Sequence, residues 1–167
     1  MSATPATWLA DEAAPFAKVT DSPEKWSVVA DASGRGLNLV TGSDLPACLV
    51  AKVSVTSPPS RWNDDPKQAL TCCLGGSIIK WLRTLEAFVI PKIPGVGEPR
   101  SCVKTNQFAE TFTRAKLGPA TRFYDKAGNR RDQYEDAMEA YVLLTLRPYC
   151  FSGAKGISVK LIGFQPA

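Results

Sequence analysis

The sequence contains no histidine. This absence excludes Ser-His and Cys-His catalytic pairs, and it argues against a zinc site, for which histidine is a usual ligand. The five cysteines are odd in number and show no C-x-x-C spacing, which indicates reduced structural thiols in apolar surroundings. No Gly-rich phosphate loop of the type G-x-x-x-x-G-K-[ST] is present either. We therefore expect no enzyme activity, no cofactor and no metal.

The acidic residues are of the type that binds Mg²⁺, but they have simpler explanations. Asp64 and Asp65 stand where we expect a helix to begin, and capping accounts for them. Solvation in a loop of mixed charge accounts for the others, namely Asp125, Asp132, Glu135 and Asp136.

The sequence also lacks long apolar runs, and none approaches the ~18 residues of a membrane span. The N-terminal segment has neither the basic start nor the apolar centre of a signal peptide. Free thiols fit a reducing compartment. We expect an intracellular protein of a reducing compartment that does not bind membranes.

Positive charge is concentrated in the second part of the chain. Residues 1–66 hold 5 Lys and Arg against 8 Asp and Glu, whereas residues 67–167 hold 15 against 8. Between Arg100 and Arg131 there are 8 cations and 2 anions. Such a density attracts polyanions, although a merely solvated charged face is the alternative explanation.

Two segments show the alternation of a half-buried β-strand. From Cys48 to Thr56 the apolar side chains fall on one face, and the same holds from Met138 to Leu146. Pro148 is expected to end the second strand, and Gly153 and Gly156 to turn the chain before residues 157–161 resume the alternation. Further strands are expected within 100–117 and 121–124, and a turn at 125–129.

One helix is expected between the strands. Asp65 and Pro66 form a helix start, and the apolar residues from Leu70 to Leu85 follow helical spacing. Gly75 and Gly76 would lie inside this helix, where each costs roughly 1 kcal/mol relative to Ala. Pro and Gly residues at 91–99 then predict a loop that reaches away from the body.

These patterns predict a mainly β protein with one inserted helix, in the form of a small barrel with extended loops. Residues 1–40 are expected to form an N-terminal arm whose Trp8, Phe16 and Trp26 pack on the core. Residues 41–167 are expected to form the main domain.

The loop predicted between the last two strands, R-P-Y-C-F-S-G-A-K, is rich in aromatic and basic residues. It brings Tyr149 and Phe151 close to Arg147 and Lys155. Aromatic faces flanked by cations suit single-stranded nucleic acid, which stacks its bases and presents its phosphates. Packing of both rings at the rim of a barrel is the alternative.

This same region resembles a known family. The sequence T-L-R-P-Y-C-F, a short loop and then G-I-S-V-K-L are similar to the C-terminal strand pair of the T7-like bacteriophage single-stranded DNA-binding proteins. The close match covers roughly the last 30 residues. The resemblance implies an OB-fold, a five-stranded barrel, that binds single strands in replication and recombination. It also implies that Tyr149 and Phe151 stack on bases and that Lys160 is a contact of the last strand.

Members of that family end in a long acidic tail with an aromatic last residue, a pattern that residues 164–167 do not show. The resemblance therefore does not extend to recruitment of a polymerase or dimerisation through such a tail. We expect single-stranded DNA as the partner, with replication proteins and a second copy of the chain as further candidates. The alternatives are a small viral structural β-barrel protein and an RNA-binding OB module. The predicted DNA-binding residues are Lys104, Arg114, Lys116, Arg122, Tyr124, Arg130, Arg131, Arg147, Tyr149, Phe151, Lys155 and Lys160.

Overall fold

The computed structural model describes residues 8–14, 17–18, 25–34, 36–40, 45–57 and 69–167. The predicted helix start at Asp65 and Pro66, the Asp64 and Asp65 pair and Phe16 lie outside the described residues. In chain order the elements are α1 (Trp8–Ala13), β1 (Ala17–Lys18), β2 (Ser27–Ala30), β3 (Leu37–Val40), β4 (Ala47–Ser57), β5 (Ala69–Cys73), α2 (Gly76–Val89), a 3₁₀ turn (Ile90–Lys92), β6 (Glu98–Arg100), β7 (Lys104–Thr105), β8 (Thr111–Lys116), β9 (Arg122–Tyr124), β10 (Arg130–Arg131), β11 (Glu139–Phe151) and β12 (Ala154–Pro166).

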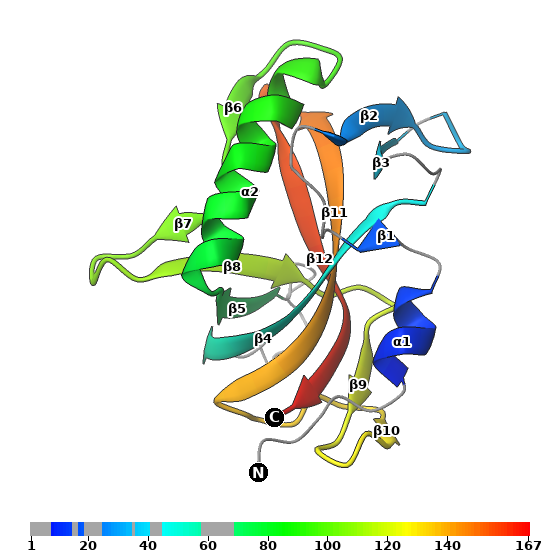
Figure 1. Cartoon of the computed structure of the whole chain (residues 1–167), viewed down its shortest axis with the longest axis vertical. Helices are drawn as coiled ribbons and strands as arrows, with labels where there is room; N and C mark the ends of the chain where they lie inside the picture. The colour runs from blue at the N-terminus through cyan, green and yellow to red at the C-terminus, as the bar shows by residue number, and fades with distance from the viewer. Residues whose placement is uncertain (1–7, 15–16, 19–24, 35, 41–44, 58–68) are drawn as a thin grey trace.

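Five strands close into a ring in the order β4, β5, β8, β12, β11 and back to β4. All neighbours are antiparallel except β8 and β12, which run parallel where Lys116 pairs with Lys160. Figure 1 shows β11 and β12 running the length of the molecule, with α2 alongside and the β7–β8 pair projecting from the body. The predicted class, mainly β with an OB-fold-like arrangement and an inserted helix, is confirmed.

The main core fills the ring because alternate side chains of each strand point inward. On β11 these are Ala140, Val142, Leu144 and Leu146, all fully buried. The alternation predicted for residues 48–56 is likewise confirmed in β4, where Lys52 is exposed between buried Ala51 and Val53.

The predicted helix begins too early. Residues 69–73 form β5, in which Leu70 and Cys72 are fully buried between half-buried neighbours. Pairing with β4 and β8 on both sides overrides the helical spacing of the apolar residues there. Gly75 is instead the N-cap of α2, in extended conformation, and Gly76 is the first helical residue.

Helix α2 closes over the core with Ile79, Leu82, Leu85 and Val89, spaced three and four residues apart. Glu86 is also buried, and its carboxylate accepts hydrogen bonds from Ser101 Oγ at 2.7 Å and from Cys102 N at 2.9 Å. Within the described residues no helix is long and apolar enough to cross a membrane.

The last strand pair is a long hairpin, so the expected end of the strand at Pro148 is wrong. Pro148 lies within β11 opposite Ile157, beyond Thr145, the last residue that pairs with β4. A proline is tolerated where its missing N–H would face an open side of the strand. Ser152 and Gly153, both with positive φ, form the two-residue turn, whereas Gly156 lies inside β12.

The described N-terminal residues contact the ring at several places, among them the pairing of β1 with β4. Trp26 and Leu39 are fully buried in the main core. On the outside of the ring, Trp8 of α1 belongs to a second, smaller core with Leu143 and Tyr124. Its indole Nε1 donates to the fully buried Gln165 Oε1 at 2.7 Å. The domain boundary at residue 40 stays a prediction.

Trp8 lies directly against Gly163 of β12, and a Cβ at this position would collide with the indole ring. Gly163→Ala should therefore displace Trp8, weaken its bond to Gln165 and lower the free energy of unfolding by about 1–3 kcal/mol. Urea denaturation measures this loss. Gly76→Ala is the matched control because open space surrounds Gly76. Equal stability of the Gly163 variant and the parent would show that α1 does not pack as described.

Candidate nucleic-acid interface

The outer face of β8 combines an aromatic ring with two cations. Thr113 and Ala115 are buried at 1% and 0% exposure, so the alternating residues Phe112, Arg114 and Lys116 face outward. Arg114 and Lys116 are exposed, and Phe112 is half-buried. The strand therefore presents one aromatic and two positive side chains on a single face.

Strand pairing adds two lysines to this face. Lys160 of β12 is in register with Lys116, and Lys104 of β7 is in register with Phe112. Residues opposite each other in paired strands share a face of the sheet. We call Lys104, Arg114, Lys116 and Lys160 the basic strip.

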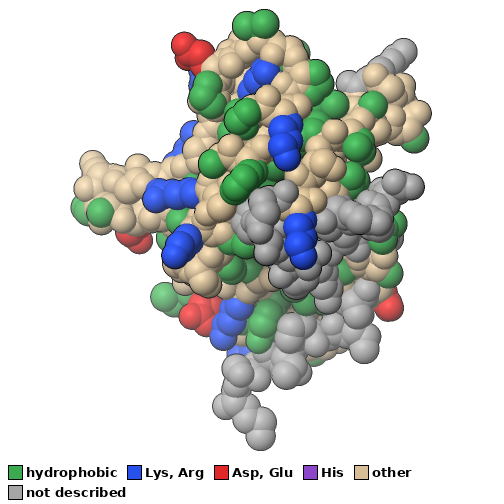
Figure 2. All heavy atoms as spheres, turned by 45° about the horizontal axis from the view of Figure 1, so that its top comes forward, with side chains coloured by type: hydrophobic (Ala, Val, Ile, Leu, Met, Phe, Trp, Pro, Cys, Tyr) green, Lys and Arg blue, Asp and Glu red, His purple; other side chains and the backbone are tan. Residues whose placement is uncertain are grey.

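The basic strip carries little compensating charge. Strands β5, β7, β8 and β12 contain no Asp or Glu. None of the four cations forms an ion pair with another described residue. Lys and Arg side chains also outnumber acidic ones on the face seen in Figure 2, which includes the β7–β8 projection. The strip is therefore free to neutralise phosphates.

A groove of about 310 Å³ begins at the end of the strip. Thr145, Arg147 and Lys160 line it from the sheet, and Asn38 and Pro46 line it from the N-terminal side. Its other wall is the loop 118–121, held to β12 by Thr121 Oγ1, which donates to the Leu161 carbonyl at 2.6 Å. The groove thus has a firmly held wall and two cations.

The hairpin divides the four residues that the sequence placed in one loop. Arg147, Tyr149 and Phe151 alternate along β11 and share a face, whereas Lys155 pairs with Cys150 on the other face. Lys155 Nζ donates to the Ile93 carbonyl at 2.6 Å. The expectation that all four lie together in a loop is therefore wrong, because these residues belong to paired strands.

Arg147 is already engaged within the chain. Its guanidinium lies 2.8 Å from Asp31 Oδ2, and its Nε donates to the Leu37 carbonyl at 3.2 Å. The Ser33 hydroxyl above all, with a further contribution from Arg147, holds the pKa of Asp31 below its usual range. Asp31 is thus ionised at neutral pH, and Arg147 contributes less free positive charge than the strip.

The two aromatic rings of the hairpin differ in exposure. Phe151 is 77% exposed beside the turn. Tyr149 is half-buried and lies across Gly156, where a Cβ would stand 2.9 Å from the Tyr149 hydroxyl oxygen. Phe151 has the more open face for stacking, while Tyr149 depends on the absence of a side chain at Gly156.

The remaining predicted residues lie on β9 and β10, beside α1 (Figure 1). Arg122 is 3.4 Å from Glu12, and Arg131 is 2.9 Å from Asp125. Tyr124 is 6% exposed and its ring stacks on Trp8 at 4.2 Å, so its face is covered. Arg130 is exposed.

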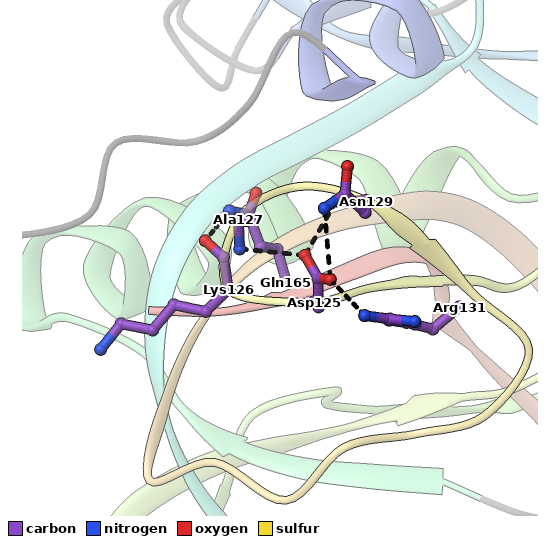
Figure 3. Close-up of polar contacts among 6 residues, drawn as sticks. All are labelled: Asp125, Lys126, Ala127, Asn129, Arg131 and Gln165. Atoms are coloured by element: carbon purple, nitrogen blue, oxygen red, sulfur yellow. Dashed lines mark hydrogen bonds and ion pairs between the residues drawn. The ribbon is translucent and has the colours of Figure 1, made fainter.

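Figure 3 shows that Asp125 organises the turn between β9 and β10. Its Oδ1 accepts from the N–H groups of Ala127 at 3.0 Å and of Asn129 at 2.9 Å. The Asn129 N–H, and to a smaller extent Arg131, holds the pKa of Asp125 below its usual range. Within the described part of the chain, no group of three His, Cys, Asp or Glu side chains is placed to hold a metal.

Phe112 was not among the predicted contacts, although it lies on the face of the basic strip, next to Lys104. The sequence did contain the signal, since Phe112, Arg114 and Lys116 alternate. The sequence alone does not show which face of this strand points outward. The structure does, because closure of the five-stranded ring turns Thr113 and Ala115 into the core.

The cysteines are free thiols. Burial, above all, raises the pKa of both Cys72 and Cys102 to about 12, with Cys73 and Glu86 respectively adding to the shift. Cys150 is exposed. The thiols at 72 and 102 are therefore protonated and unreactive at neutral pH.

Comparison with known proteins finds likeness in structure alone. No family model and no curated protein matches the sequence. The single-stranded DNA-binding protein from bacteriophage Enc34 matches with a TM-score of 0.53 at 11% identity, over 85% of this chain and 89% of that chain. Its complex with single-stranded DNA matches with a TM-score of 0.52 at 14% identity, over 86% and 96%. Gp2.5, a single-stranded DNA-binding protein of bacteriophage T7, matches with a TM-score of 0.41 at 12% identity, over 70% and 82%.

At these identities the likeness to the Enc34 structures shows a shared fold. The fold implied by the resemblance of residues 141–165 is thereby supported over most of the chain.

The thiols should react in an order set by burial. In native protein at pH 8, the aromatic disulfide reagent DTNB should modify Cys150 rapidly and leave Cys72 and Cys102 unmodified until urea unfolds the chain. The absorbance of the released thiolate measures the rate at which Cys150 reacts and the rate at which the buried thiols react. Cys150→Ser should remove the rapid phase. Rapid modification of Cys72 or Cys102 in the folded protein, or unfolding by a chelator, would contradict a structural role for these thiols.

Proposed function

We propose that this chain binds single-stranded DNA with little sequence preference and acts in phage replication and recombination inside the host cell. The observation that carries the proposal is the basic strip, four exposed cations on one face of an OB-fold-like arrangement, carried by strands β7, β8 and β12, which contain no Asp or Glu. Phosphates are neutralised there, and Phe112 stands among the cations as a base-stacking surface.

The position of the strip in the fold supports this assignment. OB-folds bind oligonucleotides on the face of their second and third strands and with the loops between strands one and two and between strands four and five. In this ring the second and third strands are β5 and β8, and the loop between the fourth and fifth is the hairpin turn next to Phe151. The basic strip and the exposed Phe151 side chain therefore occupy the surfaces that this fold uses to bind ligands.

The structural neighbour determined with single-stranded DNA bound supports DNA as the partner. We include Tyr149, Phe151 and the groove at Lys160 in the interface, since they continue the face of β11 and β12. Replication proteins and a second copy of the chain are proposed as further partners. We propose no catalytic role, because the strip offers cations and rings without a nucleophile or a base.

Salt dependence tests the strip. Arg114→Ala, Lys116→Ala and Lys160→Ala should each weaken binding and make the slope of log K against log salt less negative by about 0.7, since each removes one phosphate contact to a single strand. Fluorescence anisotropy of labelled oligo-dT over a series of NaCl concentrations gives both quantities.

Lys126→Ala is the matched control, because it removes the same charge from the turn between β9 and β10 (Figure 3). It should leave the slope nearly unchanged. Equal affinity for duplex DNA, binding that is independent of salt, or an equal effect of the control would refute the proposal. Tighter binding of oligo-rU would assign the chain to RNA.

The hairpin aromatics make a separate prediction. Phe151→Ala and Tyr149→Ala should each weaken binding by about 1–3 kcal/mol with little change in salt slope, because a base loses its stacking partner while phosphate contacts remain. Phe151 is 77% exposed, so its replacement should also leave the melting temperature unchanged. If the Tyr149 ring serves only to pack the hairpin, its loss should instead cost up to ~3–5 kcal/mol of stability and leave binding by the folded protein intact. Thermal melts and isotherms on the same samples distinguish these results.

A further inference from the structure

The β7–β8 arm, residues 104–112, projects from the body of the protein (Figure 1). Lys104 pairs with Phe112 and Thr105 with Thr111, and residues 106–110 form the tip. An extension of this length is not required to close the ring, which β8 completes through β5 and β12. Its tip therefore calls for a separate explanation.

The tip holds an aromatic ring out in solvent. Phe108 is 74% exposed, although phenylalanine is among the residues most often buried. Next to it, Ala109 has a φ of 61°, a left-handed conformation that is unfavourable for a residue with a Cβ. Two features of the tip thus lower the stability of the fold, the exposed Phe108 side chain and the strained backbone at Ala109.

Asn106 holds this conformation in place. Its Oδ1 accepts from the N–H groups of Phe108 at 2.9 Å and Glu110 at 3.0 Å. Its backbone N–H donates to the Glu110 carbonyl at 3.0 Å, and its carbonyl accepts from Ala109 N at 3.1 Å. Glu110, the single carboxylate of the arm, accepts from Asn106 Nδ2 at 3.2 Å. These hydrogen bonds therefore fix the backbone of the tip at Phe108.

The arm also continues the basic strip. Lys104 lies in the arm itself, and Arg114 follows two residues after its end. Figure 2 shows Lys and Arg side chains between the end of the arm, which carries both hydrophobic and acidic side chains, and the body. Cations that lead to an exposed aromatic side chain are an arrangement in which a single strand can stack a base at one end of its path.

We propose that Phe108 stacks on a base of the bound single strand, so that the arm extends the interface beyond the five-stranded ring. This rests on the proposed function. The ligand is a nucleobase of any identity, because every base offers a π-face. Because hydrogen bonds already fix the backbone at the tip, only the Phe108 side chain has to be ordered on binding.

Phe108→Ala tests the proposal in the full chain. It should weaken binding of a long oligo-dT by about 5- to 150-fold with the salt slope unchanged, since one stack is lost and no phosphate contact is. The melting temperature should not change, because the ring is exposed. Phe88→Ala on α2 is the matched control, a phenylalanine that is 44% exposed outside the strip, and it should bind like the parent.

Phe108→Trp provides an independent readout. It should bind at least as tightly as the parent, and its indole fluorescence should fall when oligo-dT is added, by more than the change seen in the parent. Asn106→Ala should weaken binding less than Phe108→Ala, because it loosens the tip while the ring remains.

The outcomes separate this inference from the proposed function. If the parent binds oligo-dT and the strip variants weaken it, but Phe108→Ala binds like the parent, the role of Phe108 is refuted and the strip stands. If Phe108→Ala changes the oligomeric state without DNA, measured by light scattering, the ring contacts protein and the inference also fails. If the parent does not bind oligo-dT, both proposals fail together.

Discussion

The pairing of β12 with its neighbours is the interaction on which the rest of the structure depends. This strand pairs with β11, β8, β9 and β6, so it closes the ring and also connects the structure outside it. The same strand carries two positions at which a Cβ would collide with a neighbour, Gly156 beneath Tyr149 and Gly163 against Trp8. Fully buried Gln165 joins α1 to the turn between β9 and β10, since it accepts from Trp8 and donates to the Lys126 carbonyl. A change in the register of β12 would move every one of these contacts to the wrong face.

The fold also places the positive side chains in two groups, those that lie beside a carboxylate and those that do not. Arg122, Arg131 and Arg147 lie near carboxylates, and each such surface pair adds little to stability. Their effect is to reduce the charge available for a ligand on those faces. On β8 and β12 no carboxylate is present, so Lys116 and Lys160 remain side by side without compensation among the described residues. Like charges held in register repel each other, and a polyanion relieves this repulsion.

Aromatic residues follow the same division. Tyr124 stacks on Trp8 and serves the smaller core. Phe112, Phe151 and Phe108 keep part or nearly all of their surface open and lie in or beside the strands that carry the free cations. An exposed aromatic side chain near cations suits a ligand that has bases and phosphates. A buried aromatic side chain stabilises the fold instead.

Local alternation of side chains along the sequence is enough to predict several features of this protein. The strands at β4 and β11, the turn at 125–129 and the mainly β class are visible because side-chain direction repeats every two residues along one chain. Only the tertiary structure decided the state of residues 70–73, which helical spacing fits equally well, because two neighbouring strands pair with them. It also decided which cations are free, since Arg147 meets Asp31 across 116 residues and Lys116 meets Lys160 through a parallel pairing. Contacts between distant parts of a chain depend on how its strands are paired in space, and no local pattern in the sequence encodes that pairing.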